Sequence, residues 1–141
     1  MSIFPADVTP ESLNSMSKDT MMKHIGIEFI EVGADYIKAT MPVDHRTYQP
    51  YGLLHGGASV TLAETLGSVG AHCTIDHNKQ YAVGLDINAN HLRSAKSGIV
   101  TGISKPIHIG RKTQVWEIKI TNEEDKLICI SRITMSIVDK I

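Results

Sequence analysis

The spacing of apolar residues predicts strands towards both ends of the chain and a helix between them. From residue 25 to residue 43, short runs rich in β-branched and apolar residues predict two strands joined by a turn at residues 33–35. From residue 81 onward, apolar and polar residues alternate, which predicts four further strands. These strands span residues 81–93, 99–109, 113–121 and 126–138. The last connections are of hairpin length, so a meander is the simplest topology.

Residues 56–75 form the most distinctive segment, because nearly every side chain in it is small or apolar. A helix without a polar face is typical of a buried position. A helix of about 19 residues would extend about 28 Å, which is enough to cross a small domain. Its internal glycines each lower helix propensity by about 1 kcal/mol relative to alanine, so packing must compensate. Glycine and alanine also permit a close approach of the backbone, which favours a helix held tightly by a sheet.

Two remaining segments complete the expected architecture. Residues 9–17 begin with threonine, proline and glutamate, which are typical of an N-cap and first turn and predict a short helix. Residues 45–54 follow neither period and predict a loop. We therefore expect an α+β fold over the single domain 1–141, with an antiparallel sheet of about six strands wrapped around one long central helix. Such a sheet leaves apolar surface uncovered, which favours a dimer or larger oligomer.

Composition excludes several classes of protein. The chain has 141 residues, a formal net charge of -1 and 21% charged residues, so neither nucleic acid nor a membrane is an expected partner. The first residues contain no basic start followed by an apolar run, and no stretch approaches the roughly 18 apolar residues of a membrane span. A cytoplasmic protein is expected. Cys73 and Cys129 have no paired spacing and are expected to be reduced, buried thiols.

A carboxylate in the predicted helix is the main candidate for chemistry. Gly57, Glu64 and Ser68 are separated by seven and four residues, so they share one stripe of the helix. Burying an unpaired charge is costly, and a glutamate in such a helix therefore needs an explanation. A structural salt bridge at the rim of the core is one explanation, and a catalytic group is the other.

The start of the same helix offers a second candidate feature. His55 precedes Gly56 and Gly57, and backbone N–H groups at a helix N-terminus without obstructing side chains can hold a developing oxyanion. The two glycines also suit a tight turn into the helix, which needs no chemistry. An oxyanion site and a carboxylate on one face, about 10 Å apart, would suit acyl transfer.

The run QPYGLLHGG at residues 49–57, followed by Glu64 and Ser68, resembles the motif of hotdog-fold acyl-CoA thioesterases. The most similar branch contains bacterial aroyl-CoA thioesterases, such as 1,4-dihydroxy-2-naphthoyl-CoA thioesterases, and 4-hydroxybenzoyl-CoA thioesterases. The resemblance extends from about residue 13 to the end of the chain. It implies the hotdog fold, in which an antiparallel sheet wraps around a central helix. It also implies hydrolysis of an aromatic or medium-chain acyl-CoA to the free acid and CoA.

The resemblance also assigns roles to individual residues. It makes Glu64 the nucleophile or the general base, and Gly57 the oxyanion N–H donor. It makes Gln49 and His55 the groups that orient the thioester, and Ser68 the hydroxyl that positions water or the carboxylate. In the family these groups meet between two subunits of a homo-oligomer, expected to be a dimer of dimers. No cofactor is implied, because CoA is part of the substrate.

Residues that would contact the acyl-CoA are expected on the later strands. Cations and turn amides there can bind phosphate groups, although charges at strand ends are more often only solvated. With the resemblance, the expected acyl and CoA contacts are Val83, Gly84, His91, Arg93, Ser94, Lys105, Pro106, His108, Gly110 and Arg111. His72, Cys73 and His77 lack a second pair of ligands, so no metal site is expected.

Two alternative functions stay open at this point. A hotdog-fold dehydratase or hydratase also uses a histidine and an acidic residue on acyl thioesters, but the spacing from the His55 motif to Glu64 argues against it. The other alternative is a non-catalytic module that binds acyl-CoA. Such a module would have little need for a carboxylate inside the helix.

Overall fold

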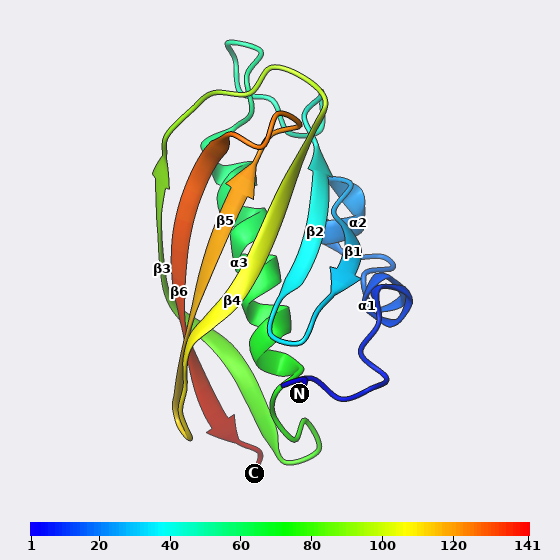
Figure 1. Cartoon of the computed structure of the whole chain (residues 1–141), viewed down its shortest axis with the longest axis vertical. Coiled ribbons are helices and arrows are strands. Elements are labelled where there is room, and N and C mark those ends of the chain that lie inside the picture. Colours follow the sequence, from blue (N-terminus) through cyan, green and yellow to red (C-terminus); the bar gives the residue numbers. More distant parts are fainter.

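A long helix, α3 (Gly56–His72), runs along the inside of a six-stranded antiparallel sheet in the computed structural model, which describes residues 1–141 (Figure 1). Two short helices, α1 (Pro10–Met16) and α2 (Met21–His24), precede the first strand. The strands are β1 (Glu28–Val32), β2 (Ile37–Pro42), β3 (Gln80–His91), β4 (Ile99–Ile109), β5 (Thr113–Thr121) and β6 (Leu127–Asp139). The α+β class, the six strands and the central helix predicted from the sequence are confirmed.

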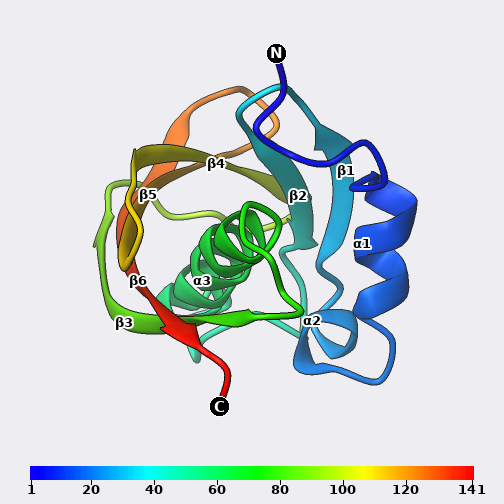
Figure 2. The ribbon, with the colours of Figure 1, turned by 90° about the horizontal axis from the view of Figure 1, so that it is seen from below.

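The order of the strands differs from the predicted meander. It is β1-β2-β4-β5-β6-β3, so β3 pairs with β6 at the far edge and not with β4. The segment 92–98 is therefore a crossover from one edge of the sheet to the middle, although its length suits a hairpin. Seen along the helix, the sheet curls around α3, with β1 at one edge and β3 at the other (Figure 2). Hydrophobic periodicity identifies strands but does not specify which strands pair.

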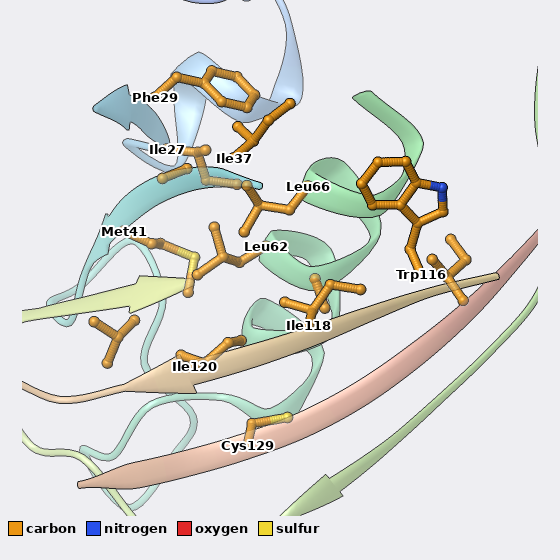
Figure 3. Close-up of a cluster of buried hydrophobic side chains, with 14 of the residues drawn as sticks. Ile27, Phe29, Ile37, Met41, Leu62, Leu66, Trp116, Ile118, Ile120 and Cys129 are labelled. Atoms are coloured by element: carbon orange, nitrogen blue, oxygen red, sulfur yellow. The ribbon is translucent and has the colours of Figure 1, made fainter. Parts of the chain in front are cut away.

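The core lies between α3 and the concave face of the sheet. Leu62 and Leu66 of α3 are fully buried against side chains from β2 and β5 (Figure 3). The sheet contributes Ile37, Met41, Trp116, Ile118, Ile120, Ile133 and Met135, all of which are fully buried. Trp116 donates its indole N–H to Gln114 at 2.8 Å, and Gln114 donates to Thr74 at 2.9 Å. These bonds satisfy the buried polar atoms where α3 ends.

The glycines of α3 allow the sheet to approach the helix closely, as the sequence predicts. A methyl group added at Gly67 would lie 2.4 Å from the Ile133 side chain, and one at Gly70 would lie 2.7 Å from the Trp116 ring. Both distances are well below the usual contact distance between carbon atoms. Tertiary packing therefore compensates for the low helix propensity of these two positions.

We expect Gly70→Ala to lower the free energy of unfolding. Alanine gains about 1 kcal/mol of helix propensity over glycine, but inserting a methyl group into a filled core costs about 1–3 kcal/mol. Urea denaturation of Gly70→Ala, Trp116→Leu and the double variant checks this. The smaller leucine should relieve the clash. The double variant should therefore lose less free energy of unfolding than the sum of the losses in the two single variants. Strict additivity would contradict the contact.

The starts and ends of the helices largely follow local sequence signals, but one short helix, α2, was not predicted from the sequence. Thr9 caps α1 and forms a reciprocal pair of bonds with Ser12, as the predicted N-terminus requires. Helix α3 ends at His72, three residues before the predicted end. Helix α2 was not predicted, because a single turn of four residues is too short to show a helical period.

Both cysteines are free and buried, which confirms the expectation of buried, unpaired thiols. Burial raises the pKa of Cys129, and burial with the nearby negative charge of Asp7 raises the pKa of Cys73 to about 11. A thiol with a raised pKa and little access to solvent reacts slowly with electrophiles. These cysteines are structural residues of the core.

His72, the last residue of α3, stacks on His77 of the following connection, and this pair should make stability depend on pH. His72 and His77 lie with ring centroids 5.1 Å apart. Burial, followed by repulsion from His77 and Lys140, lowers the pKa of His72 below its usual 6.5. A lowered folded-state pKa gives stability that is present above the unfolded pKa and is lost as the pH falls. We expect His72→Gln to flatten the decline in melting temperature below about pH 6.5; an unchanged decline would contradict this role.

Candidate active site

The loop before α3 is ordered by its own hydrogen bonds and positions two of the predicted site residues. The His55 N–H donates to the Thr47 carbonyl at 2.8 Å, and the buried Thr47 hydroxyl donates to the Pro42 carbonyl at 2.7 Å. The Gln49 N–H donates to the Leu53 carbonyl at 2.8 Å. This loop therefore connects the end of β2 rigidly to the start of the helix.

Gly52 supplies the tight turn within this loop. Its φ of +76° lies in the left-handed region that favours glycine, and its N–H donates to the Gln49 carbonyl at 2.9 Å. At the same turn, the Tyr51 N–H donates to the side-chain oxygen of Gln49. Because this bond occupies the oxygen, the Gln49 amide NH2 is the end left to donate to a ligand.

His55 is the N-cap residue of α3, and its ring is oriented by the first turn of the helix. Its Nδ1 accepts a hydrogen bond of 2.8 Å from the Gly57 N–H. A ring nitrogen that accepts a bond carries no proton, so the neutral ring holds its proton on Nε2, and Nε2–H becomes a donor. The side chain is exposed, so this donor is available to a ligand.

The same bond distinguishes the two glycines at the start of the helix. The Gly57 N–H is already used by His55, whereas the Gly56 N–H donates to no acceptor within the chain. Gly56 lies close to the Nε2 end of the His91 ring, since a methyl group added at Gly56 would lie 2.9 Å from His91 Nε2. The free N–H of the helix start is therefore that of Gly56, one residue before the predicted Gly57.

Glu64 lies two turns into α3, on the face that the sheet leaves open. It is half-buried, and no cation or hydrogen-bond donor of the chain pairs with its carboxylate. It lines a groove of about 490 Å³ between α2 and α3, together with Met21, Met22, Val60, Thr61, Thr65, Ser68 and Val69. Within the chain, the structural salt bridge that was one of the two sequence-based explanations does not form.

Two neighbours of Glu64 were also predicted from the sequence. Gly84 of β3 faces the carboxylate, since a methyl group added there would lie 3.9 Å from Glu64 Oε2. The pairing of β3 with β6 shifts directly after Gly84, and such bulges often redirect a strand beside an active site. Ser68 lines the same groove, but its hydroxyl donates to Met135 Sδ at 3.7 Å and not to Glu64.

A second cavity, of about 410 Å³, gathers several predicted residues at the N-terminal end of α3. It is lined by the loop before the helix, by the end of β3 and by the crossover that follows β3. The predicted site residues among its lining are Gln49, His91, Arg93 and Ser94, and Gly56 lines it as well. This cleft is more polar than the groove beside Glu64 and carries a cation.

The remaining predicted contacts lie elsewhere in the single chain. Successive residues of a strand face opposite sides of the sheet, so the Val83 side chain points away from α3, which Gly84 faces. The other predicted contacts lie on β4 or on the turn after it: Lys105, Pro106, His108, Gly110 and Arg111. None of these five lines the groove or the cleft. Their expected contact with CoA stays a prediction.

One chain does not bring the carboxylate and the free N–H together. Gly56 and Glu64 are eight residues apart in one helix, which corresponds to about 12 Å along its axis. In a reacting thioester, the carbonyl oxygen would accept from the Gly56 N–H while Glu64 acts at the carbonyl carbon. Both groups would then have to lie within about 3 Å of two atoms that are bonded to each other. The two groups therefore belong to different substrate positions within a single chain.

The outer edge of β3 is suited to pairing with another strand. β3 has 12 residues and pairs with β6 on one side only. It carries the exposed apolar side chains of Tyr81, Val83 and Leu85, of which Leu85 is 70% exposed. A long, apolar and uncovered edge is an established template for strand addition.

The groove wall formed by Met21 and Met22 was missed in the sequence. Two adjacent methionines in a polar segment give no periodic signal, and the wall exists only because α2 folds back beside α3. No three histidine, cysteine, aspartate or glutamate side chains gather in a way that could hold a metal ion. No helix combines the length and apolar character required to cross a membrane.

Comparison with known proteins gives one consistent family. A family model described as the thioesterase superfamily matches residues 51–129. The 1,4-dihydroxy-2-naphthoyl-CoA hydrolase of Escherichia coli is 51% identical over 96% of this chain and 98% of its own length. The proofreading thioesterase EntH of Cronobacter turicensis is 46% identical over 96% and 98%. A Pseudomonas aeruginosa thioesterase, crystallised as a glutamine-to-alanine variant, superposes with a TM-score of 0.96 at 44% identity, over 99% of this chain and 100% of that one.

Proposed function

Because the chain belongs to the thioesterase superfamily, we propose that it hydrolyses acyl-CoA thioesters to the free acid and CoA, at a site shared by two copies of the chain. The observation that carries this proposal is the Glu64 carboxylate, which lies unpaired in an apolar groove on the open face of a hotdog-fold helix. An unpaired carboxylate that lines an apolar groove is typical of a catalytic group.

Glu64 can act on a thioester in two ways. As a nucleophile, it attacks the carbonyl carbon, the C–S bond breaks, CoA leaves as the thiolate, and water then hydrolyses the resulting anhydride. As a general base, it takes a proton from water while the water oxygen attacks the same carbon. In either route the carbonyl oxygen gains negative charge before the C–S bond breaks. Both routes require Glu64 in its ionised form.

The start of α3 supplies donors for that oxygen. We propose the Gly56 N–H as the oxyanion donor in place of Gly57, since the Gly57 N–H is already bound to His55. The bond from Gly57 instead fixes the His55 ring with Nε2–H as a donor. We propose the Gln49 amide NH2 as a further donor to the thioester, because its side-chain oxygen already accepts from the Tyr51 N–H. One such preorganised N–H is worth about 3 kcal/mol in the transition state.

Two copies of the chain are needed to bring these groups together. The separation of Gly56 and Glu64 along one helix supports a site in which Glu64 of one copy meets Gly56, His55 and Gln49 of another. Pairing of the two β3 edges would place the open faces of two α3 helices against each other. Assembly of two such dimers into a tetramer follows from the family resemblance.

The substrate would extend from the groove to the polar cleft. The apolar groove suits the acyl group, and the cleft with His91, Arg93 and Ser94 suits the CoA arm. An aromatic acyl group is proposed from the resemblance and from the name of the Escherichia coli hydrolase. Ser68 is proposed to position the attacking water. No cofactor takes part in this scheme, and the two unpaired thiols suit a cytoplasmic location.

Release of the CoA thiol tests this function. Purified protein should release thiol from benzoyl-CoA and from octanoyl-CoA, measured with a chromogenic disulfide reagent, while its own buried cysteines should react only slowly in the native state. Loss of the enoyl absorbance of crotonyl-CoA without thiol release would instead identify a hydratase. Binding of all three thioesters without any reaction would identify a non-catalytic module.

A further inference from the structure

The groove beside Glu64 has two walls of different character. One wall is α3, which contributes Glu64 and a row of hydroxyl side chains at Thr61, Thr65 and Ser68. The opposite wall is α2, which contributes only Met21 and Met22. An acyl group whose carbonyl carbon lies at the Glu64 carboxylate would therefore have its body against α2.

Helix α2 is held less firmly than α3, the opposite wall of the groove. It is a single turn without a buried residue, and Thr20 at its N-cap forms no capping hydrogen bond with it. Its C-terminal end is anchored, because the Ile27 N–H donates to the Met22 carbonyl at 2.9 Å and Ile27 is buried. Few buried contacts and an uncapped start permit local movement at low cost in free energy.

The two methionines differ in what they contact. Met22 is half-buried and packs against the main core, so it forms the base of this wall. Met21 is 63% exposed and has no such contact, although it lines the groove. An apolar side chain that remains exposed at the mouth of an apolar groove becomes buried when an apolar ligand fills the groove.

We propose that α2 is the selectivity wall for the acyl group, with Met21 closing over the acyl body and Met22 setting the depth of the groove. This inference rests on the proposed function, in which Glu64 marks the position of the carbonyl carbon. Methionine is unbranched and polarisable, so it adapts to flat rings and to flexible chains. The groove would accordingly accept uncharged acyl groups of differing shape and prefer those long or wide enough to reach α2.

Binding of unreactive thioether analogues tests the wall without requiring turnover. In calorimetric titrations of wild-type protein with S-methyl-, S-butyl- and S-octyl-CoA, we expect affinity to rise about fourfold for each methylene group buried. Met21→Ala should bind S-octyl-CoA about tenfold more weakly and S-methyl-CoA within about twofold of wild type. Met21→Leu, which restores an apolar side chain of similar size, should recover most of the loss.

Met16→Ala is the matched control. Met16 is 54% exposed on α1 and does not line the groove, so its replacement should leave all three affinities unchanged. An equal loss of affinity by Met21→Ala for every chain length, or no loss for any, would overturn the proposed wall. Thiol release from the matching acyl-CoA esters separates the two proposals. A chain-length effect on binding without thiol release would leave the wall intact and reject the hydrolase.

Discussion

Replacing Glu64 by glutamine is expected to lower kcat for thiol release by about 10²–10⁴-fold while leaving the fold and the binding of acyl-CoA intact. Glutamine has the same shape but neither attacks a carbonyl carbon nor accepts the proton of water. Because Glu64 has no ion pair and is only half-buried, the free energy of unfolding should change by no more than about 0.5 kcal/mol.

Glu117→Gln provides the matched control for this change. Glu117 is also half-buried, but it lies on β5 and forms an ion pair of 3.7 Å with Lys119 away from the groove. It should retain the kcat of the wild type. If the Glu64 variant kept its kcat, or if its activity fell only in proportion to the folded fraction, Glu64 would be structural.

Replacing Gly56 by proline should produce the second large loss. Gly56 is the first residue of α3, the position where proline is best tolerated, and His55 before it has the extended backbone that proline requires. Proline therefore removes the free N–H and preserves the start of the helix. Loss of one oxyanion donor lowers kcat by about 10²–10³-fold.

Gly56→Ala separates the effect of the N–H from the effect of added bulk. Both variants place a β-carbon against the His91 ring, at a distance of 2.9 Å from Nε2 before any adjustment. Only the proline variant lacks the N–H donor, so its kcat should be about 10²–10³-fold lower than that of the alanine variant. Equal kcat values for the two variants would exclude Gly56 as the donor and return the role to Gly57.

Local sequence patterns were sufficient to predict the elements of this fold. The bounds of β4 and β5 agree with the predicted ranges, and Thr9 caps α1 as expected. Strand pairing was not accessible in the same way, because β3 and β4 have the same alternation whether they pair with each other or not. The position of β3 at the far edge depends on the path of the chain around α3.

The candidate site was predictable in composition but less so in geometry. The combination of Glu64 with the glycines at residues 56 and 57 follows from helical spacing and from the resemblance. Which glycine N–H is free depends on the hydrogen bond to His55 Nδ1, and a sequence does not specify the orientation of a side chain. The contribution of Met21 depends on a single helical turn that carries no period.

Mixing two inactive variants tests the central claim, that Glu64 of one copy acts on a carbonyl held by Gly56 of another. The purified Glu64→Gln protein and the purified Gly56→Pro protein would be mixed at equal concentrations, unfolded, refolded together and assayed for thiol release. If two copies share each site, half of the dimers are mixed and each has one intact site, so about a quarter of wild-type activity should return. If each chain builds its own site, every site keeps one defect, and the refolded mixture would be as inactive as its components.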